Sequence, residues 1–117
     1  MAVDDKAKLL GSALLIVTPG SPMIGCLFTS VGFGKRKSSR ETIISATSTA
    51  FRDLCAQLLG LVPEGQQAQR REFWMPQINS GLFDVPWQLT EAKLKAMGPE
   101  EVCHISKLVV FTYPTPP

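Results

Sequence analysis

The residues whose types and spacing could do chemistry lie in one short stretch, residues 73–87, which reads FWMPQINSGLFDVPW. Its centre is the polar Asn-Ser-Gly of residues 79–81, set between two apolar segments. A loop this apolar is either well packed or shaped around a ligand, because connecting segments are usually polar and solvated. Successive backbone amides around a glycine form a concave nest that binds anionic oxygens. Leu82 and Phe83 could then form an apolar wall for a sugar or a base; the alternative is a tight, packed turn.

A second glycine-bearing loop, residues 32–37, reads GFGKRK and precedes the long helix expected below. It does not fit the common phosphate-binding motifs. A Walker loop needs a glycine where this chain has Thr29, and the dinucleotide motif needs one at Lys37. The lysines could still attract an anion toward the start of a helix. A solvated basic loop is the interpretation that we favour.

Cysteine and histidine give no pattern typical of a metal site. Cys26, Cys55 and Cys103 are an odd number of thiols within apolar runs, which favours reduced thiols in an intracellular protein, cytoplasmic or nuclear. Cys103 and His104 form a neighbouring pair without a second pair at ligand spacing, so we expect no metal and no cofactor. His104 is best interpreted as an ordinary residue at a strand end.

Size and charge limit the classes of function. The chain has 117 residues, of which 44% are hydrophobic and 19% charged, so we expect one globular domain over residues 1–117. A net charge of +2 is too small to indicate a nucleic acid or an anionic membrane as partner. Lys6 and Lys8 before an apolar run loosely imitate a secretory signal, but Asp4 and Asp5 argue against one.

Hydrophobic periodicity predicts the order strand, strand, helix, strand, helix, strand. Residues 12–18 and 23–29 are apolar strands around a Pro-Gly turn, and we expect both of their faces to be covered. A helix begins at a capping box formed by Ser38 and Glu41 and ends near Gly60. Its apolar stripe comprises Ile43, Ile44, Thr47, Ala50, Phe51, Leu54, Cys55, Leu58 and Leu59.

In the second half of the chain, prolines indicate where the helix and the strands begin or end. Residues 72–78 form a strand with Pro76 near its end, residues 87–97 a helix after Pro86, and residues 104–113 the last strand. Trp74 and Trp87 could stack on an adenine, but we favour core positions for both. Alternating helices and buried strands indicate a layered α/β domain, whose ligands bind at loops that leave the carboxyl ends of strands.

The segment MPQINSGLFDVPW resembles the phosphate-binding loop of macrodomains, specifically the branch of the fungal ADP-ribose 1''-phosphate phosphatases. The segment IGCLFTSVGFG, residues 24–34, is similar to a strand and glycine loop of that family, and the likeness extends to the closing helix and strand. The resemblance implies a three-layer α/β/α fold with a mixed sheet. It also implies hydrolysis of the terminal phosphate of ADP-ribose 1''-phosphate to give ADP-ribose and phosphate.

The same resemblance implies that one bend, residues 78–84, wraps the diphosphate and distal ribose of ADP-ribose with its backbone amides. We call these residues the Asn-Ser-Gly bend; they are Ile78, Asn79, Ser80, Gly81, Leu82, Phe83 and Asp84. Two alternatives remain: a module that binds ADP-ribose without turnover, and an inactive truncated relic without a ligand.

Two departures from the family pattern affect the expected chemistry. Asp84 stands where the family has a glycine, which puts a carboxylate near a bound anion unless it turns outward to cap the helix. A complete macrodomain also opens with a strand, a helix and a strand that bear an Asn- and Gly-rich stretch, and the family residues proposed for catalysis lie there. Nothing before Leu10 resembles that part, so the chain is similar to the carboxyl-terminal two-thirds.

The catalytic residue is therefore unknown. We favour neither Asp84 nor His104 as a base. A related branch cleaves ADP-ribosyl esters with a Lys and an Asp, but this chain has Phe83 at the Asp position and Ser30 or Val31 at the Lys position. That second chemistry is unsupported.

Overall fold

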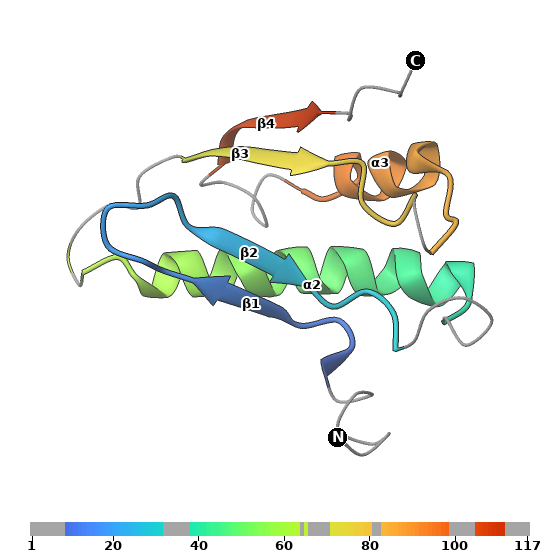
Figure 1. Cartoon of the computed structure of the whole chain (residues 1–117), viewed down its shortest axis with the longest axis horizontal. Helices are drawn as coiled ribbons and strands as arrows, with labels where there is room; N and C mark the ends of the chain where they lie inside the picture. Colours follow the sequence, from blue (N-terminus) through green and yellow to red (C-terminus); the bar gives the residue numbers. More distant parts are fainter. Residues whose placement is uncertain are drawn as a thin grey trace.

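A computed structural model describes residues 9–31, 38–63, 65, 71–80, 83–98 and 105–111. The order of elements is the predicted one (Figure 1). They are β1 (Ala13–Ile16), β2 (Ile24–Leu27), α2 (Arg40–Gly60), β3 (Arg71–Pro76), α3 (Trp87–Lys95) and β4 (Ile105–Phe111). The protein is a mixed α/β structure in which β1 and β2 pack across α2, and α3 packs beside α2.

The strands β1 and β2 form the predicted antiparallel hairpin. Their register places Ala13 opposite Leu27 and Ile16 opposite Ile24. In the turn, Gly20 has φ +76°, a left-handed conformation that glycine adopts without steric cost. The hairpin therefore follows from local sequence: two apolar runs and a connector that can reverse the chain.

The outer edge of β1 is covered by side chains of α2. Asp53 Oδ2 accepts a hydrogen bond from the amide of Ala13 at 2.8 Å, and Gln57 Nε2 donates to the carbonyl of Ala13 at 2.8 Å. The two side chains also bond to each other at 3.2 Å. At Ala13, therefore, the backbone groups on the outer edge of β1 are already hydrogen-bonded and do not pair with another strand.

The start of α2 differs by one residue from the prediction. Ser39 is the N-cap and accepts from the amide of Thr42 at 3.2 Å, so the capping box expected from Ser38 and Glu41 is wrong. Ser38 instead exchanges hydrogen bonds with the preceding segment: its amide donates to Ser30 Oγ at 2.9 Å, and its Oγ accepts from Val31 at 3.0 Å. A capping pattern in the sequence does not show which of two adjacent serines caps the helix when one of them bonds to the segment that precedes the helix.

Seven of the nine residues of the predicted apolar stripe of α2 are buried; the exceptions are Ile44, which is half-buried, and Leu59, which is 54% exposed. The buried residues of this helix are Ile43, Ala46, Thr47, Ser48, Ala50, Phe51, Leu54, Cys55 and Leu58. The spacing of three and four residues follows the helical period and turns one face inward. The helix ends at Gly60, where the prediction placed its end.

The strands β3 and β4 run parallel and form a second sheet, separate from the hairpin. In the described part of the chain, no ladder joins β2 to β3. Contact between the second sheet and the helix layer comes partly from Phe73, whose ring lies 5.9 Å from that of Phe51 on α2. Figure 1 shows the β1–β2 hairpin across α2 and the β3–β4 pair above this helix in the view.

The expectation that both faces of the strands are covered is wrong. Leu14, Ile16 and Ile24 are 50%, 40% and 57% exposed, and Trp74 is 66% exposed. The reason is that α2 covers one face of the hairpin, while no described element packs on the other. Apolar runs without alternation indicate a strand buried on both sides, but they do not supply the second layer.

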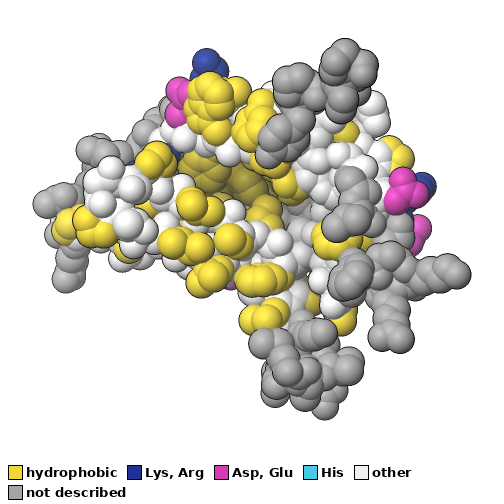
Figure 2. Space-filling view, viewed as in Figure 1, with side chains coloured by type: hydrophobic (Ala, Val, Ile, Leu, Met, Phe, Trp, Pro, Cys, Tyr) yellow, Lys and Arg dark blue, Asp and Glu magenta, His cyan; other side chains and the backbone are white. Residues whose placement is uncertain are grey.

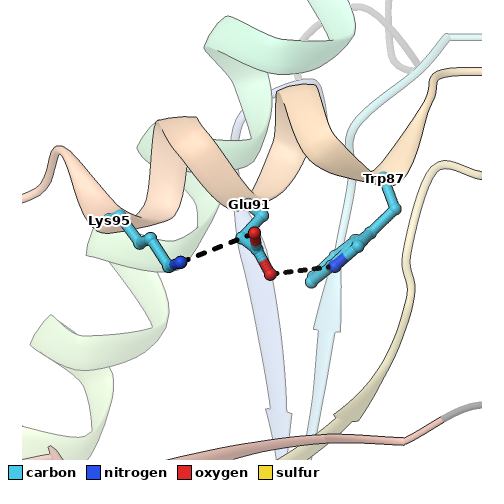
Figure 3. Close-up of polar contacts among 3 residues, drawn as sticks. All are labelled: Trp87, Glu91 and Lys95. Carbon is cyan, nitrogen blue, oxygen red and sulfur yellow. Dashed lines mark hydrogen bonds and ion pairs between the residues drawn. The ribbon is translucent and has the colours of Figure 1, made fainter.

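Helix α3 begins at Trp87, as predicted, and ends at Lys95, two residues before the predicted end. Trp87 is buried, as expected, whereas the core position expected for Trp74 is wrong. The indole of Trp87 donates to Glu91 Oε2 at 3.2 Å, and Lys95 Nζ lies 3.5 Å from Glu91 Oε1 (Figure 3). This spacing of four residues aligns the three side chains along one face of the helix.

Neither described helix combines the length and the apolar character that crossing a membrane would require.

Candidate functional site

A cavity of about 740 Å³ lies between the two sheets, and we call it the inter-sheet cavity. Side chains of β2, α2 and β3 line it, among them Leu27, Leu54, Leu58, Phe73 and Met75. The space-filling view shows a hollow whose walls are mainly hydrophobic (Figure 2). Ile78, Asn79 and Phe83 of the Asn-Ser-Gly bend also line it, so the bend adjoins this hollow.

The bend reverses the chain through two left-handed residues. Asn79 has φ +67° and Asp84 has φ +52°. The carbonyl of Asn79 accepts a hydrogen bond from the amide of Val85 at 2.8 Å and so closes the bend at its neck. Because asparagine and aspartate tolerate this backbone region better than most residues, both positions suit a tight turn.

The side chain of Asn79 is buried and bonded on three sides by threonines. Its Oδ1 accepts from Thr29 Oγ1 at 2.8 Å, and its Nδ2 donates to Thr47 Oγ1 at 2.9 Å and to Thr90 Oγ1 at 3.2 Å. These three hydroxyls belong to the segment after β2, to α2 and to α3. We call the four residues the Asn79 network, and it ties the bend to three separate parts of the chain.

The network was not predicted as a unit from the sequence. Thr47 belonged to the predicted apolar stripe, but Thr29 and Thr90 carried no signal of their own. Each threonine is at most 4% exposed. A buried hydroxyl requires a hydrogen-bond partner, and only the tertiary arrangement shows that all three share the same asparagine.

The other residues of the predicted site divide into three groups. Ser80 and Asp84 are exposed and Phe83 is half-buried, while Gly81 and Leu82 lie outside the described residues. The amide of Ile78 donates to the carbonyl of Pro76 at 2.9 Å and is thus used within the chain.

Two backbone amides of the bend are available to a ligand. Within the described part of the chain, nothing accepts a hydrogen bond from the amides of Ser80 and Asp84. Asp84 does not cap α3 through its side chain, because the N-cap is Pro86 and no side-chain hydrogen bond is made there. The helix-capping role considered for Asp84 is therefore absent among the described contacts.

The second predicted loop, residues 32–37, lies outside the described residues. Its neck is described, and it is closed by the exchange between Ser38, Ser30 and Val31. Thr29, just before this neck, bonds to Asn79. The ends of β2 and β3 thus meet at one end of the structure, as expected for loops at the carboxyl ends of strands.

Other candidate groups give little chemistry. Cys26 and Cys55 form no disulfide among the described residues, and Cys55 is buried. No group of three or more His, Cys, Asp or Glu side chains within the described ranges could hold a metal ion. Cys103 and His104 lie outside those ranges.

Comparison with known proteins identifies relatives of this chain. No protein-family model matches it. Proteins named ADP-ribose 1''-phosphate phosphatase from Meyerozyma guilliermondii, Debaryomyces hansenii and Chaetomium globosum are 41%, 38% and 37% identical to it. The matched regions cover 74%, 75% and 77% of this chain. The resemblance to the fungal ADP-ribose 1''-phosphate phosphatases is confirmed.

The match is partial with respect to these phosphatases. The chain spans a little over half the length of the relatives, namely 57%, 57% and 53%. Identity at this level over about 100 residues is more than a shared short motif, because the bend accounts for only seven positions. The relationship to these phosphatases thus rests on most of the chain and not on the bend alone.

Proposed function

We propose that this protein acts in the chemistry of ADP-ribose 1''-phosphate, with the Asn-Ser-Gly bend as its substrate loop. The names of the relatives support the substrate, and the geometry of the bend supports the site. The observation that carries the proposal is a left-handed bend, closed by the hydrogen bond from Val85 to Asn79, beside a cavity and directly before α3. Amides in such a bend, together with the start of a helix, suit the negative charge of a diphosphate.

The reaction is the hydrolysis of the terminal monophosphate, giving ADP-ribose and phosphate. In this proposal the Asn-Ser-Gly bend, residues 78–84, wraps the diphosphate and distal ribose. Ser80 and Asp84 are the described amide donors, since the amide of Ile78 is already bonded to the carbonyl of Pro76. Amides fixed in this way stabilise the charge on phosphoryl oxygens. Phosphate-monoester hydrolysis also needs an aligned water or nucleophile, and we assign no residue of this chain to that role.

The proposed domain spans residues 1–117 and corresponds to the carboxyl-terminal part of a three-layer macrodomain. Two features support an incomplete sheet. The outer edge of β1 is engaged by Asp53 and Gln57, whereas the facing edges of β2 and β3 border the inter-sheet cavity. The exposed Leu14, Ile16 and Ile24 form an apolar face that a further helix layer would cover. Two strand pairs that border the same cavity without a ladder between them fit an incomplete sheet.

A module that holds ADP-ribose without turnover is the second candidate function. It is favoured by one observation: residues 78–84 include no histidine, lysine or cysteine. The thiols of Cys26 and Cys55, which form no disulfide with each other, support an intracellular location, cytoplasmic or nuclear, for either function.

Two assays on the whole chain test these candidates. Calorimetry with ADP-ribose measures binding, and phosphate release from ADP-ribose 1''-phosphate measures turnover. Both signals together support the phosphatase, binding without release supports the module, and the absence of both refutes the site. The folded state is checked by circular dichroism in each case.

A pair of glycine variants locates the binding. Gly81→Val should abolish the calorimetric signal, because a branched side chain fills the close approach that an amide nest requires. Gly60→Val is the matched control: Gly60 ends α2, and a Cβ there meets no atom within 4 Å. Unchanged affinity in Gly81→Val would remove the bend as the site.

A further inference from the structure

We infer that Asn79 is a positioning residue that holds the Asn-Ser-Gly bend in its ligand-ready conformation, and not a side chain that contacts the ligand. The inference rests on the proposed function only for what the bend holds. It is carried by the geometry of the Asn79 network, in which the asparagine is 8% exposed and each threonine is more deeply buried.

Both hydrogen-bond donors of the Asn79 side chain are used inside the protein. Its two amide hydrogens point to Thr47 Oγ1 and Thr90 Oγ1, at 2.9 and 3.2 Å. An asparagine side chain has no third hydrogen to offer. A phosphate oxygen, which accepts hydrogen bonds, therefore finds no donor on this side chain.

The orientation of the Asn79 amide follows from its neighbour on α2. Thr47 Oγ1 donates its hydrogen to the carbonyl of Ile43 at 2.7 Å. The same oxygen must then accept from Asn79, so the nitrogen of the amide, and not its oxygen, faces Thr47. Aspartate would place an acceptor against an acceptor at this point, which explains why the amide and not the acid suits the position.

The backbone of the same residue shapes the bend. Asn79 has φ +67° and its carbonyl accepts from Val85 at 2.8 Å. Because the side chain is held by three hydrogen bonds, the Cα of Asn79 is held in place with it, which restrains the backbone of this left-handed residue. The network thereby stabilises the conformation in which the neck of the bend is closed.

The network also couples the bend to α2 and α3. Thr47 is one residue of α2 and Thr90 one residue of α3, and Asn79 contacts both. A change on α2, far from the bend in sequence, is therefore expected to alter ligand binding. This consequence separates a positioning role from a general contribution to stability.

The test uses Thr47→Val and Thr47→Ser in the whole chain, with two readouts. Valine keeps the shape but removes the acceptor, so ADP-ribose affinity should fall about tenfold, and serine, which restores the hydroxyl, should recover most of it. In hydrogen exchange without ligand, the Val85 amide should lose more protection in Thr47→Val than the amides of α2 do. Thr90→Val with Thr90→Ser is a second pair if Thr47→Val does not fold.

Cys55→Ala is the control. Cys55 is a buried residue of α2 that belongs neither to the network nor to the lining of the cavity, so its loss should lower stability while changing affinity little. A Thr47→Val that affects affinity and Val85 protection no more than Cys55→Ala does overturns the inference. If the wild-type chain binds no ADP-ribose, the proposed function fails, and the exchange at Val85 still decides whether Asn79 holds the bend.

Discussion

The end of the inter-sheet cavity at Asn79 and its strand-lined middle are built from opposite kinds of side chain. At the end, an asparagine and three threonines make directional hydrogen bonds between the two strand pairs and both helices. In the middle, apolar residues of β2, α2 and β3 face a hollow of about 740 Å³. Hydrogen bonds specify angles and partners, whereas apolar contacts mainly specify area.

This difference shows how a candidate site can be ordered although the two strand pairs beside it are not joined into one sheet. The bend takes its conformation from the Asn79 network and from the hydrogen bond to Val85. Neither depends on a ladder between β2 and β3, which is absent from the described residues. The candidate site is thus held by the Asn79 network, while the inter-sheet cavity leaves room for the apolar side chains that line it to rearrange. Three substitutions test this contrast.

Asn79→Ala should produce the largest effect. It removes three buried hydrogen bonds, leaves threonine hydroxyls without their partner and places alanine at a left-handed φ, so the free energy of unfolding should fall by about 3 kcal/mol. Urea denaturation measures this change. Ser80→Ala is the control, because Ser80 is exposed and its hydroxyl donates to the carbonyl of Gln77, outside the Asn79 network. A loss of less than about 1 kcal/mol for Asn79→Ala would contradict a stabilising network.

Gly25→Ala should have an intermediate effect and tests the middle of the cavity. A Cβ on Gly25 would lie 2.8 and 2.9 Å from the two terminal methyl carbons of Leu54. Because Leu54 also lines the inter-sheet cavity, its tip has space to rotate away, and the free energy of unfolding should fall by only about 1 kcal/mol.

The control for Gly25→Ala is Gly60→Ala, which adds the same methyl group where it meets no neighbour. Thermal unfolding compares the two variants. A loss of about 3 kcal/mol in Gly25→Ala would mean that Leu54 cannot move, and that the middle of the cavity is as tightly specified as its polar end.

Asp84→Gly should change stability least, by less than about 1 kcal/mol, because glycine fits φ +52° more easily but gains freedom when unfolded. Its effect should appear in binding: removing a carboxylate beside a bound diphosphate should strengthen ADP-ribose affinity. Asp84→Asn isolates the charge, since asparagine also tolerates this backbone region. Equal affinity in wild type and in both variants, measured by calorimetry, would show that the carboxylate faces away from the ligand.

The sequence determined the order of elements, because that order depends on local patterns. The apolar runs around Gly20, the helical period of α2 and Pro86 before α3 act within a few residues of each other. The Asn-Ser-Gly bend was also visible, since Pro76, Gly81 and Pro86 mark irregular backbone by their own conformational limits. The relationship to the phosphatases was likewise legible in the chain.

Only the tertiary structure decided which polar groups meet and which faces stay bare. Ser39 caps α2 in place of Ser38, because Ser38 bonds to Ser30 and Val31. Trp74 is exposed because no described layer covers its side of β3. Thr29, Asn79 and Thr90 are far apart in sequence, and their shared hydrogen bonds exist only once the elements have packed. Periodicity reports which side of an element is apolar; the partner on that side is set by contacts between distant residues, which no local pattern encodes.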